Sequence, residues 1–232
     1  MTTSQPLSDV ATTASLVTAS RLVVNVDVVI LTLLAGELQV LLRRTPAVSL
    51  QQNEWSIPGD FVPIEMGLED AARHELESAT HLHDIYLEQL YTFGDPKRDP
   101  RTRVITVVYF ALVDAARLQI KDIERDGQRR WFSMYQLPPL ILDHQYILDY
   151  TLQRMREKLE YTTIGFQLLA PEFTLRELQI VYEAILGRKL DKRNFRKKIL
   201  STNILDETAM TKMEGPHRPA RLYRFKADAA RV

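Results

Sequence analysis

The sequence contains no cysteine and no long uninterrupted apolar run. The first absence excludes disulfide bonds, thiolate metal ligands and cysteine nucleophiles, and it fits a reducing cytosol. The longest mostly apolar stretch, residues 28–34, is far too short to span a bilayer. Residues 1–20 are rich in Ser and Thr but lack a basic start and an apolar centre, so we expect a disordered arm and not a signal peptide. The protein is therefore predicted to be cytoplasmic.

Net charge is also absent, because 30 Lys and Arg residues balance 30 Asp and Glu residues. The balance is uneven along the chain: residues 188–232 hold 13 basic and 5 acidic residues, and the remaining 187 residues hold 17 and 25. A basic C-terminal part on a neutral whole indicates a module that binds a polyanion. A solvated basic face without a partner is the alternative.

The first 138 residues alternate short apolar segments with one amphipathic segment. Strands are predicted over residues 22–34, 38–42, 61–62, 87–93, 104–112 and 131–135. A helix is predicted over residues 67–80 from the spacing of its apolar side chains. This order of elements indicates an α+β fold, a mixed sheet with helices, as one domain over residues 21–138.

A Leu-Pro-Pro-Leu sequence at residues 137–140 marks a domain boundary. Asp143 can then cap a long helix over residues 144–161. His144, at the start of that helix, is expected to be a capping or packing residue and not a metal ligand. We therefore predict a linker helix within residues 139–162 and a second domain over residues 163–232.

The second domain has the layout of a winged helix-turn-helix. Thr174 and Glu177 form a capping box that opens a helix, and Gly187 ends it. Asp191 caps a second helix over residues 192–200, and residues 205–212 and 220–225 form a two-stranded ribbon. Helix, short linker, helix and hairpin in this order are typical of DNA-binding domains.

The second helix of this domain is the strongest candidate for contact with DNA. Phe195 and Ile199 share one face and are expected to pack inward. The outward side chains expected to read bases are Arg193, Asn194, Arg196 and Lys197. Phosphate contacts are expected from Thr174, Arg176, Lys192, Lys198, Arg218 and Arg221. An ordinary cationic surface helix is the alternative.

Residues 58–62 and 73–82 resemble the outline of a Nudix box, Gly-x5-Glu-x7-Arg-Glu-U-x-Glu-Glu-x-Gly-U with U apolar. Aligned on Glu75, this chain departs from the pattern at Asp60, Met66, His74, Ser78, Ala79 and His81. Catalysis would need neighbouring carboxylates that hold a metal ion between phosphates. The pattern can also be aligned one residue earlier, from Gly59, but that alignment supplies only Glu77 of the required glutamate pair. Neither alignment therefore restores the metal site. We expect no catalytic residues, no metal and no cofactor, and hence a sensor.

Several residues near this box are candidates for binding an effector. Trp55 and Phe61 can stack on a base, and Arg98 and Arg101 can pair with a diphosphate without a metal. Gly59 and Glu75 complete the predicted pocket. The alternative is that both aromatic rings belong to the core and that the arginines only make a loop soluble.

With both halves considered, the chain resembles the Nudix-related transcriptional regulators of the NrtR family. The resemblance rests on Trp55-Ser56-Ile57-Pro58-Gly59, on the loop of residues 93–101, on Phe173-Thr174-Leu175-Arg176-Glu177, and on Leu190-Asp191-Lys192-Arg193-Asn194. It implies a homodimer that binds palindromic operator DNA and represses NAD metabolism genes. It also implies that ADP-ribose or a related nucleotide releases the protein from that DNA. A regulator of sugar catabolism in the same family and an active Nudix hydrolase with an accessory basic domain are the alternatives.

Overall fold

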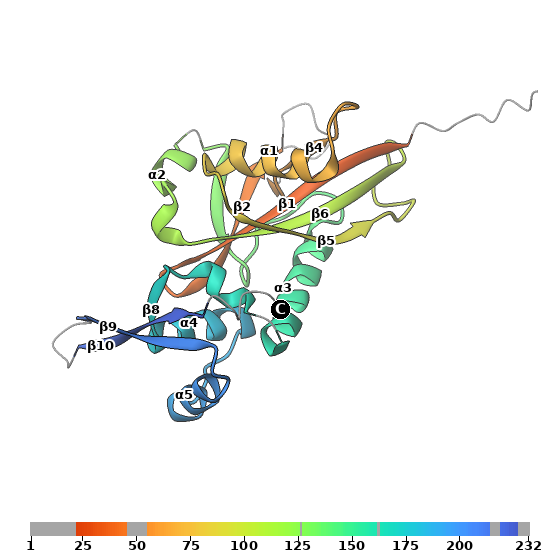
Figure 1. The fold of residues 1–232 in the computed structure, drawn as a ribbon. Coiled ribbons are helices and arrows are strands. Elements are labelled where there is room, and N and C mark those ends of the chain that lie inside the picture. The colour runs from red at the N-terminus through yellow and green to blue at the C-terminus, as the bar shows by residue number, and fades with distance from the viewer. Residues whose placement is uncertain (1–21, 46–54, 126, 162, 214–218, 227–232) are drawn as a thin grey trace, which may run out of the picture.

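The computed structural model describes residues 22–45, 55–125, 127–161, 163–213 and 219–226 (Figure 1). The predicted arm over residues 1–20 lies outside this part of the chain. A mixed sheet dominates the first domain, with the order β3-β2-β1-β6-β5 and with β4 paired to β1 and β7 paired to β2. Its strands are β1 (Val23–Leu34), β2 (Glu37–Arg44), β3 (Trp55–Ser56), β4 (Gly59–Phe61), β5 (Tyr86–Phe93), β6 (Val104–Val113) and β7 (Arg129–Ser133).

The central strand β1 explains why residues 26–33 are almost continuously apolar. It pairs in parallel with β6 over ten residues and is covered on both faces. Val28 and Ile30 belong to a core cluster with helix α1 (Leu68–Thr80), whereas Val29 and Leu31 belong to a cluster on the opposite face. Side chains alternate along a strand, so a strand buried on both sides needs apolar residues at every position.

The two faces of the sheet have different neighbours. Helix α1 covers one face, together with the one-turn η1 (Ala115–Arg117) and the short α2 (Ile120–Ile123). Helix α3 (His144–Tyr161) covers the other face, and η2 (Ile164–Leu168) follows it. The predicted helices at residues 67–80 and 144–161 are confirmed. No helix in the described ranges is long and apolar enough to cross a membrane.

The second domain is a winged helix with its own small core. It comprises β8 (Glu172–Thr174), α4 (Leu175–Leu186), α5 (Lys192–Ser201), β9 (Leu205–Lys212) and β10 (Ala220–Phe225). The predicted helices and ribbon are confirmed, and the capping box at Thr174 and the left-handed cap at Gly187 are both present. The ribbon is not two-stranded, however, because β8 adds a third strand in the order β8-β10-β9. Three residues that run directly into a helix carry no periodic signal for a strand.

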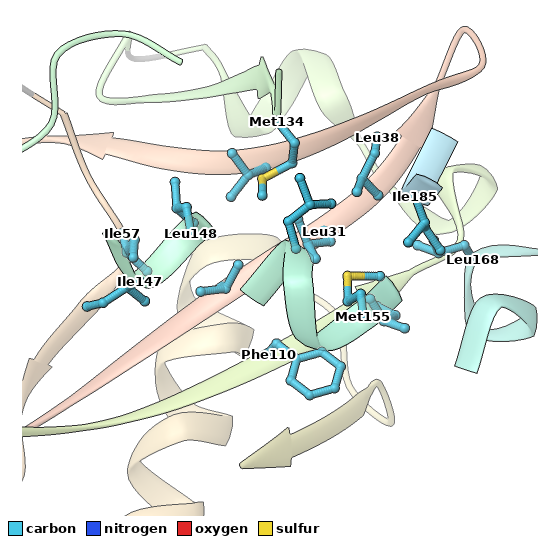
Figure 2. Close-up of a cluster of buried hydrophobic side chains, with 14 of the residues drawn as sticks. Leu31, Leu38, Ile57, Phe110, Met134, Ile147, Leu148, Met155, Leu168 and Ile185 are labelled. Atoms are coloured by element: carbon cyan, nitrogen blue, oxygen red, sulfur yellow. The ribbon is translucent and has the colours of Figure 1, made fainter. Parts of the chain in front are cut away.

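One hydrophobic core extends across both domains. Val181, Ala184 and Ile185 of α4 belong to the same buried cluster as the sheet residues Leu31 and Leu38. Figure 2 shows Ile185 beside Leu168, with Met155 of α3 and the two sheet leucines nearby. The winged helix is therefore packed on the α3 side of the first domain and is not connected to it by a free linker.

Candidate functional sites

A cavity of about 510 Å³ opens where β1, β4, the loop before β6 and the start of α3 meet. Four of the six predicted effector residues line it, namely Gly59, Phe61, Arg98 and Arg101. Polar side chains that were not among the predicted effector residues also line it, and they include Asn25, Asp27, Arg43 and Asp99. The mixture of guanidinium, carboxylate and apolar groups suits a polar small molecule with a phosphate and a flat ring.

Gly59 allows β4 to pass unusually close to β1. A Cβ atom at this position would lie 2.2 Å from Asp27 Oδ1 and 2.5 Å from the Val26 carbonyl oxygen. Any side chain would push β4 away and change the wall of the cavity. The requirement is thus steric, and it gives the Pro58-Gly59 sequence a role besides ending a strand.

Asp27 lines the cavity and is fixed by two neighbours. Its carboxylate accepts hydrogen bonds from Asn25 Nδ2 (2.9 Å) and from Thr106 Oγ1 (2.7 Å). The side chain is buried, and Thr106 comes from the adjacent strand β6. A fixed, buried carboxylate in a ligand cavity is well placed to accept hydrogen bonds from hydroxyl groups.

Arg43 of β2 connects the cavity to α1, the helix that carries most of the Nudix-box residues. Its Nη1 lies 3.5 Å from Glu75 Oε1 on α1, and its Nη2 donates to the Gly59 carbonyl oxygen. Burial raises the pKa of Glu75, although Arg43 opposes that shift. Glu75 itself does not line the cavity. Its contact with the cavity wall runs through Arg43, and its predicted role in effector binding stays a prediction.

The two predicted loop arginines line the cavity with their charges already engaged. Arg98 is almost fully buried, and its Nε and Nη2 donate to the two oxygens of Asp143 at 3.0 and 2.9 Å. Arg101 pairs with Asp99 at 2.7 Å, and this hydrogen bond holds the pKa of the Asp99 carboxyl below its usual range. An anionic ligand must therefore compete with a carboxylate for either guanidinium.

His144 is a packing residue, as predicted. Its Nδ1 accepts a hydrogen bond from the Ile57 backbone N–H at 2.9 Å, and the ring is buried. Burial lowers the pKa of His144. The contact fixes the start of α3 against the segment that leads into β4.

Trp55 belongs to the core and does not line the cavity. It is 9% exposed, packs edge-on against Phe132 at 4.7 Å and lies under the Arg44 guanidinium at 4.9 Å. Trp55 thus lies in the core, as the alternative has it, and base stacking by Trp55 stays a prediction. Phe61 is different, since it is 57% exposed at the edge of the cavity.

Three positions at which the Nudix pattern places glutamates, 66, 78 and 79, carry no carboxylate. Met66 is half-buried against the core, Ser78 is exposed and Ala79 is buried. Arg129 Nη1 donates to the carbonyl oxygens of Ser78 and Ala79 at 2.7 and 3.0 Å, which caps the end of α1. In the described part of the chain, no group of three or more His, Cys, Asp or Glu side chains is arranged to hold a metal ion.

The second site is the exposed face of α5, which lies at the far end of the winged helix from the sheet (Figure 1). Phe195 and Ile199 are buried, as predicted, and Phe195 packs edge-on against Tyr182 at 5.3 Å. The five cations Lys192, Arg193, Arg196, Lys197 and Lys198 are exposed. Among the described residues, none of them has a carboxylate within ion-pair distance, so their charge is available to a partner.

The cations of the wing are paired, in contrast to those of α5. Arg221 pairs with Glu207 across β9 and β10, Arg224 lies 3.8 Å from Asp206, and Lys212 lies 2.5 Å from Glu177. Arg218 lies outside the described residues. An anion that binds the wing must displace these carboxylates, so we expect α5 to dominate the interaction.

Thr174 is engaged in the capping box, and its predicted contact with phosphate stays a prediction. It is 1% exposed, its hydroxyl accepts from Glu177 N, and the Glu177 carboxylate accepts from its backbone N–H at 2.7 Å. The capping box thus satisfies the helix start within the chain itself. Arg176, another residue predicted to contact phosphate, lies two residues after Thr174 and is exposed.

The fold and the two sites define a Nudix-type domain fused to a DNA-binding winged helix. The NUDIX domain matches residues 22–153, and the NrtR DNA-binding winged helix domain matches residues 165–225. The chain is 37% identical over 205 residues to the "ADPR responsive transcriptional repressor NtrR" of Acinetobacter baylyi, which covers 87% of this chain and 81% of that protein. The chain therefore belongs to the NrtR family.

Two further proteins are similar to all or part of this chain. The crystal structure of Shewanella oneidensis NrtR complexed with a 27mer DNA superposes with a TM-score of 0.78 and 31% identity, covering 89% of this chain and 95% of that one. The ADP-ribose pyrophosphatase of Methanocaldococcus jannaschii is 31% identical over 97 residues, 41% of this chain and 56% of that protein. The first resembles the whole chain, and the second resembles part of it.

Proposed function

We propose that this protein is a transcriptional repressor that binds operator DNA through α5 and is released by ADP-ribose in the cavity beside Gly59. The observation that carries the proposal is the presence of both sites in one chain with a shared core. Exposed cations without an ion-pair partner in the described part of the chain lie on a capped helix, and an arginine-lined cavity lies in the domain packed against it. The A. baylyi relative, named as an ADPR-responsive repressor, supports both halves of the proposal.

The DNA-bound form is proposed to be a homodimer on a palindromic operator. A ten-residue helix such as α5 spans about 15 Å, whereas one turn of B-DNA spans about 34 Å. One copy therefore reads only part of a turn, and two copies related by a two-fold axis read two half-sites. The 27mer DNA bound by the S. oneidensis protein, about 90 Å long, has room for two such copies.

In the effector site, we assign the diphosphate to Arg98, Arg101 and Arg43, and ribose hydroxyls to Asp27. Guanidinium groups match phosphate oxygens in a two-point geometry, and a fixed carboxylate accepts from hydroxyls. Phe61 is exposed at the rim, where it can stack on the adenine ring. Because ADP-ribose derives from NAD, the regulated genes are proposed to be those of NAD metabolism.

The ligand is proposed to be bound without being hydrolysed. Met66, Ser78 and Ala79 stand where the Nudix pattern places glutamates, so the metal that activates water has no carboxylate pair to hold it. The second candidate function is an ADP-ribose hydrolase with an accessory DNA-binding domain. It is favoured by the 31% identity over 97 residues to the M. jannaschii pyrophosphatase.

One experiment separates these functions. Duplexes are selected from a random pool with the full chain, and their release is followed by fluorescence anisotropy while ADP-ribose, AMP or ribose 5-phosphate is added. We expect ADP-ribose to release the selected duplex and the two fragments to fail. The same mixture is incubated with Mg²⁺ and assayed for AMP, and steady AMP formation would favour the hydrolase. Release by a sugar phosphate alone would instead favour regulation of sugar catabolism.

A further inference from the structure

The carboxyl end of α4 is tied to the first domain by two side chains that neither site uses. The Tyr135 hydroxyl donates to the Ala184 carbonyl oxygen at 2.7 Å and lies 3.0 Å from that of Ile185. Arg156 Nε of α3 donates to the same Ile185 oxygen at 3.0 Å. The Tyr135 ring also packs against Gly187, where a Cβ atom would approach it to 3.1 Å. These contacts satisfy carbonyl groups that a helix end leaves without partners.

The opposite end of α3 lies at the effector cavity. Residues 141, 142 and 144 line the cavity, and Asp143 holds the buried Arg98 in a two-point ion pair. His144 is fixed to Ile57 by its Nδ1. An 18-residue helix is about 27 Å long, so α3 reaches from the cavity to the end of α4 as one rigid element.

The turn between α4 and α5 is rigid as well. Glu183 of α4 accepts from Leu190 N and from Lys189 Nζ, both at 2.9 Å, and Gln179 Nε2 donates to the Leu190 carbonyl oxygen at 3.0 Å. The exposed helix α5 begins two residues later. A rotation of α4 therefore carries α5 with it.

Two other surfaces of the winged helix face the first domain beside the shared core. The β1–β2 hairpin meets the middle of α4, where a Cβ atom on Gly36 would lie 3.6 Å from Ile180 Cγ2. On the far side, a cavity of about 410 Å³ separates Tyr86 of β5 and Lys158 of α3 from Phe173 and Phe225 of the winged helix. The hydrogen bonds of Tyr135 and Arg156 thus hold the carboxyl end of α4 between the shared core and this cavity.

We infer that Tyr135 and Arg156 are positioning residues that transmit the state of the effector cavity to the DNA-binding helix. The inference rests on the proposed function. A diphosphate that takes the Arg98 guanidinium from Asp143 removes one of the contacts that hold the start of α3, while His144 still holds it to Ile57. The resulting shift of α3 pulls on the Ile185 carbonyl through Arg156, and α4 turns with α5. The free energy by which ADP-ribose weakens DNA binding equals the difference in its affinity for the DNA-binding arrangement of α4 and α5 and for the rotated one.

The test uses the full-length variants Tyr135→Phe and Arg156→Met, which remove hydrogen bonds but keep most of the packing volume. Gln153→Ala is the matched control, because Gln153 is exposed on the same helix and bonds to Glu157 one turn away. For each protein, the dissociation constant of the selected duplex is measured with and without saturating ADP-ribose, and ADP-ribose binding is measured by calorimetry. The ratio of the two DNA constants is the coupling factor.

The wild type and Gln153→Ala are expected to give a coupling factor in the usual range of about 5- to 150-fold. Tyr135→Phe and Arg156→Met are expected to bind ADP-ribose as the wild type does, with a coupling factor reduced at least threefold. Folded variants that keep the wild-type coupling factor would overturn the inference. Failure of ADP-ribose to bind or to release DNA from the wild type would instead overturn the proposed function.

Discussion

Lys198 and Arg221 are both exposed cations of the winged helix, but only one of them is paired. Within the described ranges, Lys198 on α5 has no carboxylate within ion-pair distance, whereas Arg221 on β10 pairs with Glu207. When an unpaired cation binds a DNA phosphate, the counterion condensed on that phosphate is released, and this makes binding depend on salt. A paired cation must first leave its carboxylate, so its net contribution is smaller. We therefore predict that Lys198→Ala changes the salt dependence of DNA binding more than Arg221→Ala does.

The size of the effect follows from counterion release. Each phosphate contact on B-DNA adds about 0.9 to the slope of log K against log salt, so a homodimer that loses Lys198 twice loses about 1.8 from its slope. Between about 50 and 200 mM salt, the wild type should then lose about 12-fold more affinity than Lys198→Ala does. Arg221→Ala is expected to change the slope by less than half as much.

Fluorescence anisotropy with the selected duplex and with a random duplex, at four or more KCl concentrations, measures both slopes. Lys198→Ala should weaken the two duplexes by similar factors, since a phosphate contact carries no sequence information. The reasoning is refuted if the slope of Lys198→Ala equals that of the wild type. It is also refuted if Arg221→Ala flattens the slope as much as Lys198→Ala, because pairing would then not matter.

Three further predictions concern base reading, pH and the cavity. Arg193→Ala and Asn194→Ala should each cost about 1–3 kcal/mol on the selected duplex and much less on random DNA, and equal losses on both would contradict base reading. His144→Asn keeps an acceptor for the Ile57 N–H but does not titrate. Because burial holds the folded-state pKa of His144 below its ordinary 6.5, the wild type loses stability as pH falls through 6.5, by at most about 1.4 kcal/mol per pH unit. Urea unfolding between about pH 7.5 and 5.5 should show a smaller loss in the variant, and an unchanged loss would assign the titration elsewhere. Gly59→Ala should lower stability by about 1–3 kcal/mol and weaken ADP-ribose binding in calorimetry, whereas a wild-type affinity would show that β4 can move without cost.

The elements with local chemical signals could be predicted from sequence. The ends of α4 and α5 were predicted to within about one residue, because capping is a local interaction. The residues that mark them are Thr174 with Glu177, Gly187 and Asp191. The two-residue β3 and three-residue β8 could not be predicted. Such short strands are defined by their partners across the sheet and have no periodicity of their own.

The candidate sites divide in the same way. The outward face of α5 follows from helical spacing alone, since Phe195 and Ile199 fix which side is buried. The cavity depends on contacts between distant segments, such as Arg98 with Asp143, 45 residues apart, and Asp27 with Thr106, 79 residues apart. Sequence spacing therefore identified the two arginines but gave no sign that carboxylates already occupy them.

The shared core limits what an effector can do to this molecule. Val181 and Ile185 of α4 are fully buried in one cluster with the sheet residues Leu31 and Leu38. Separating the domains would expose these side chains, at roughly 1.5–3 kcal/mol for each. A typical coupling free energy of about 1–3 kcal/mol is too small to expose all of them at once. The response to a ligand must therefore keep this core closed, which leaves a pivot of α4 on it as the available motion.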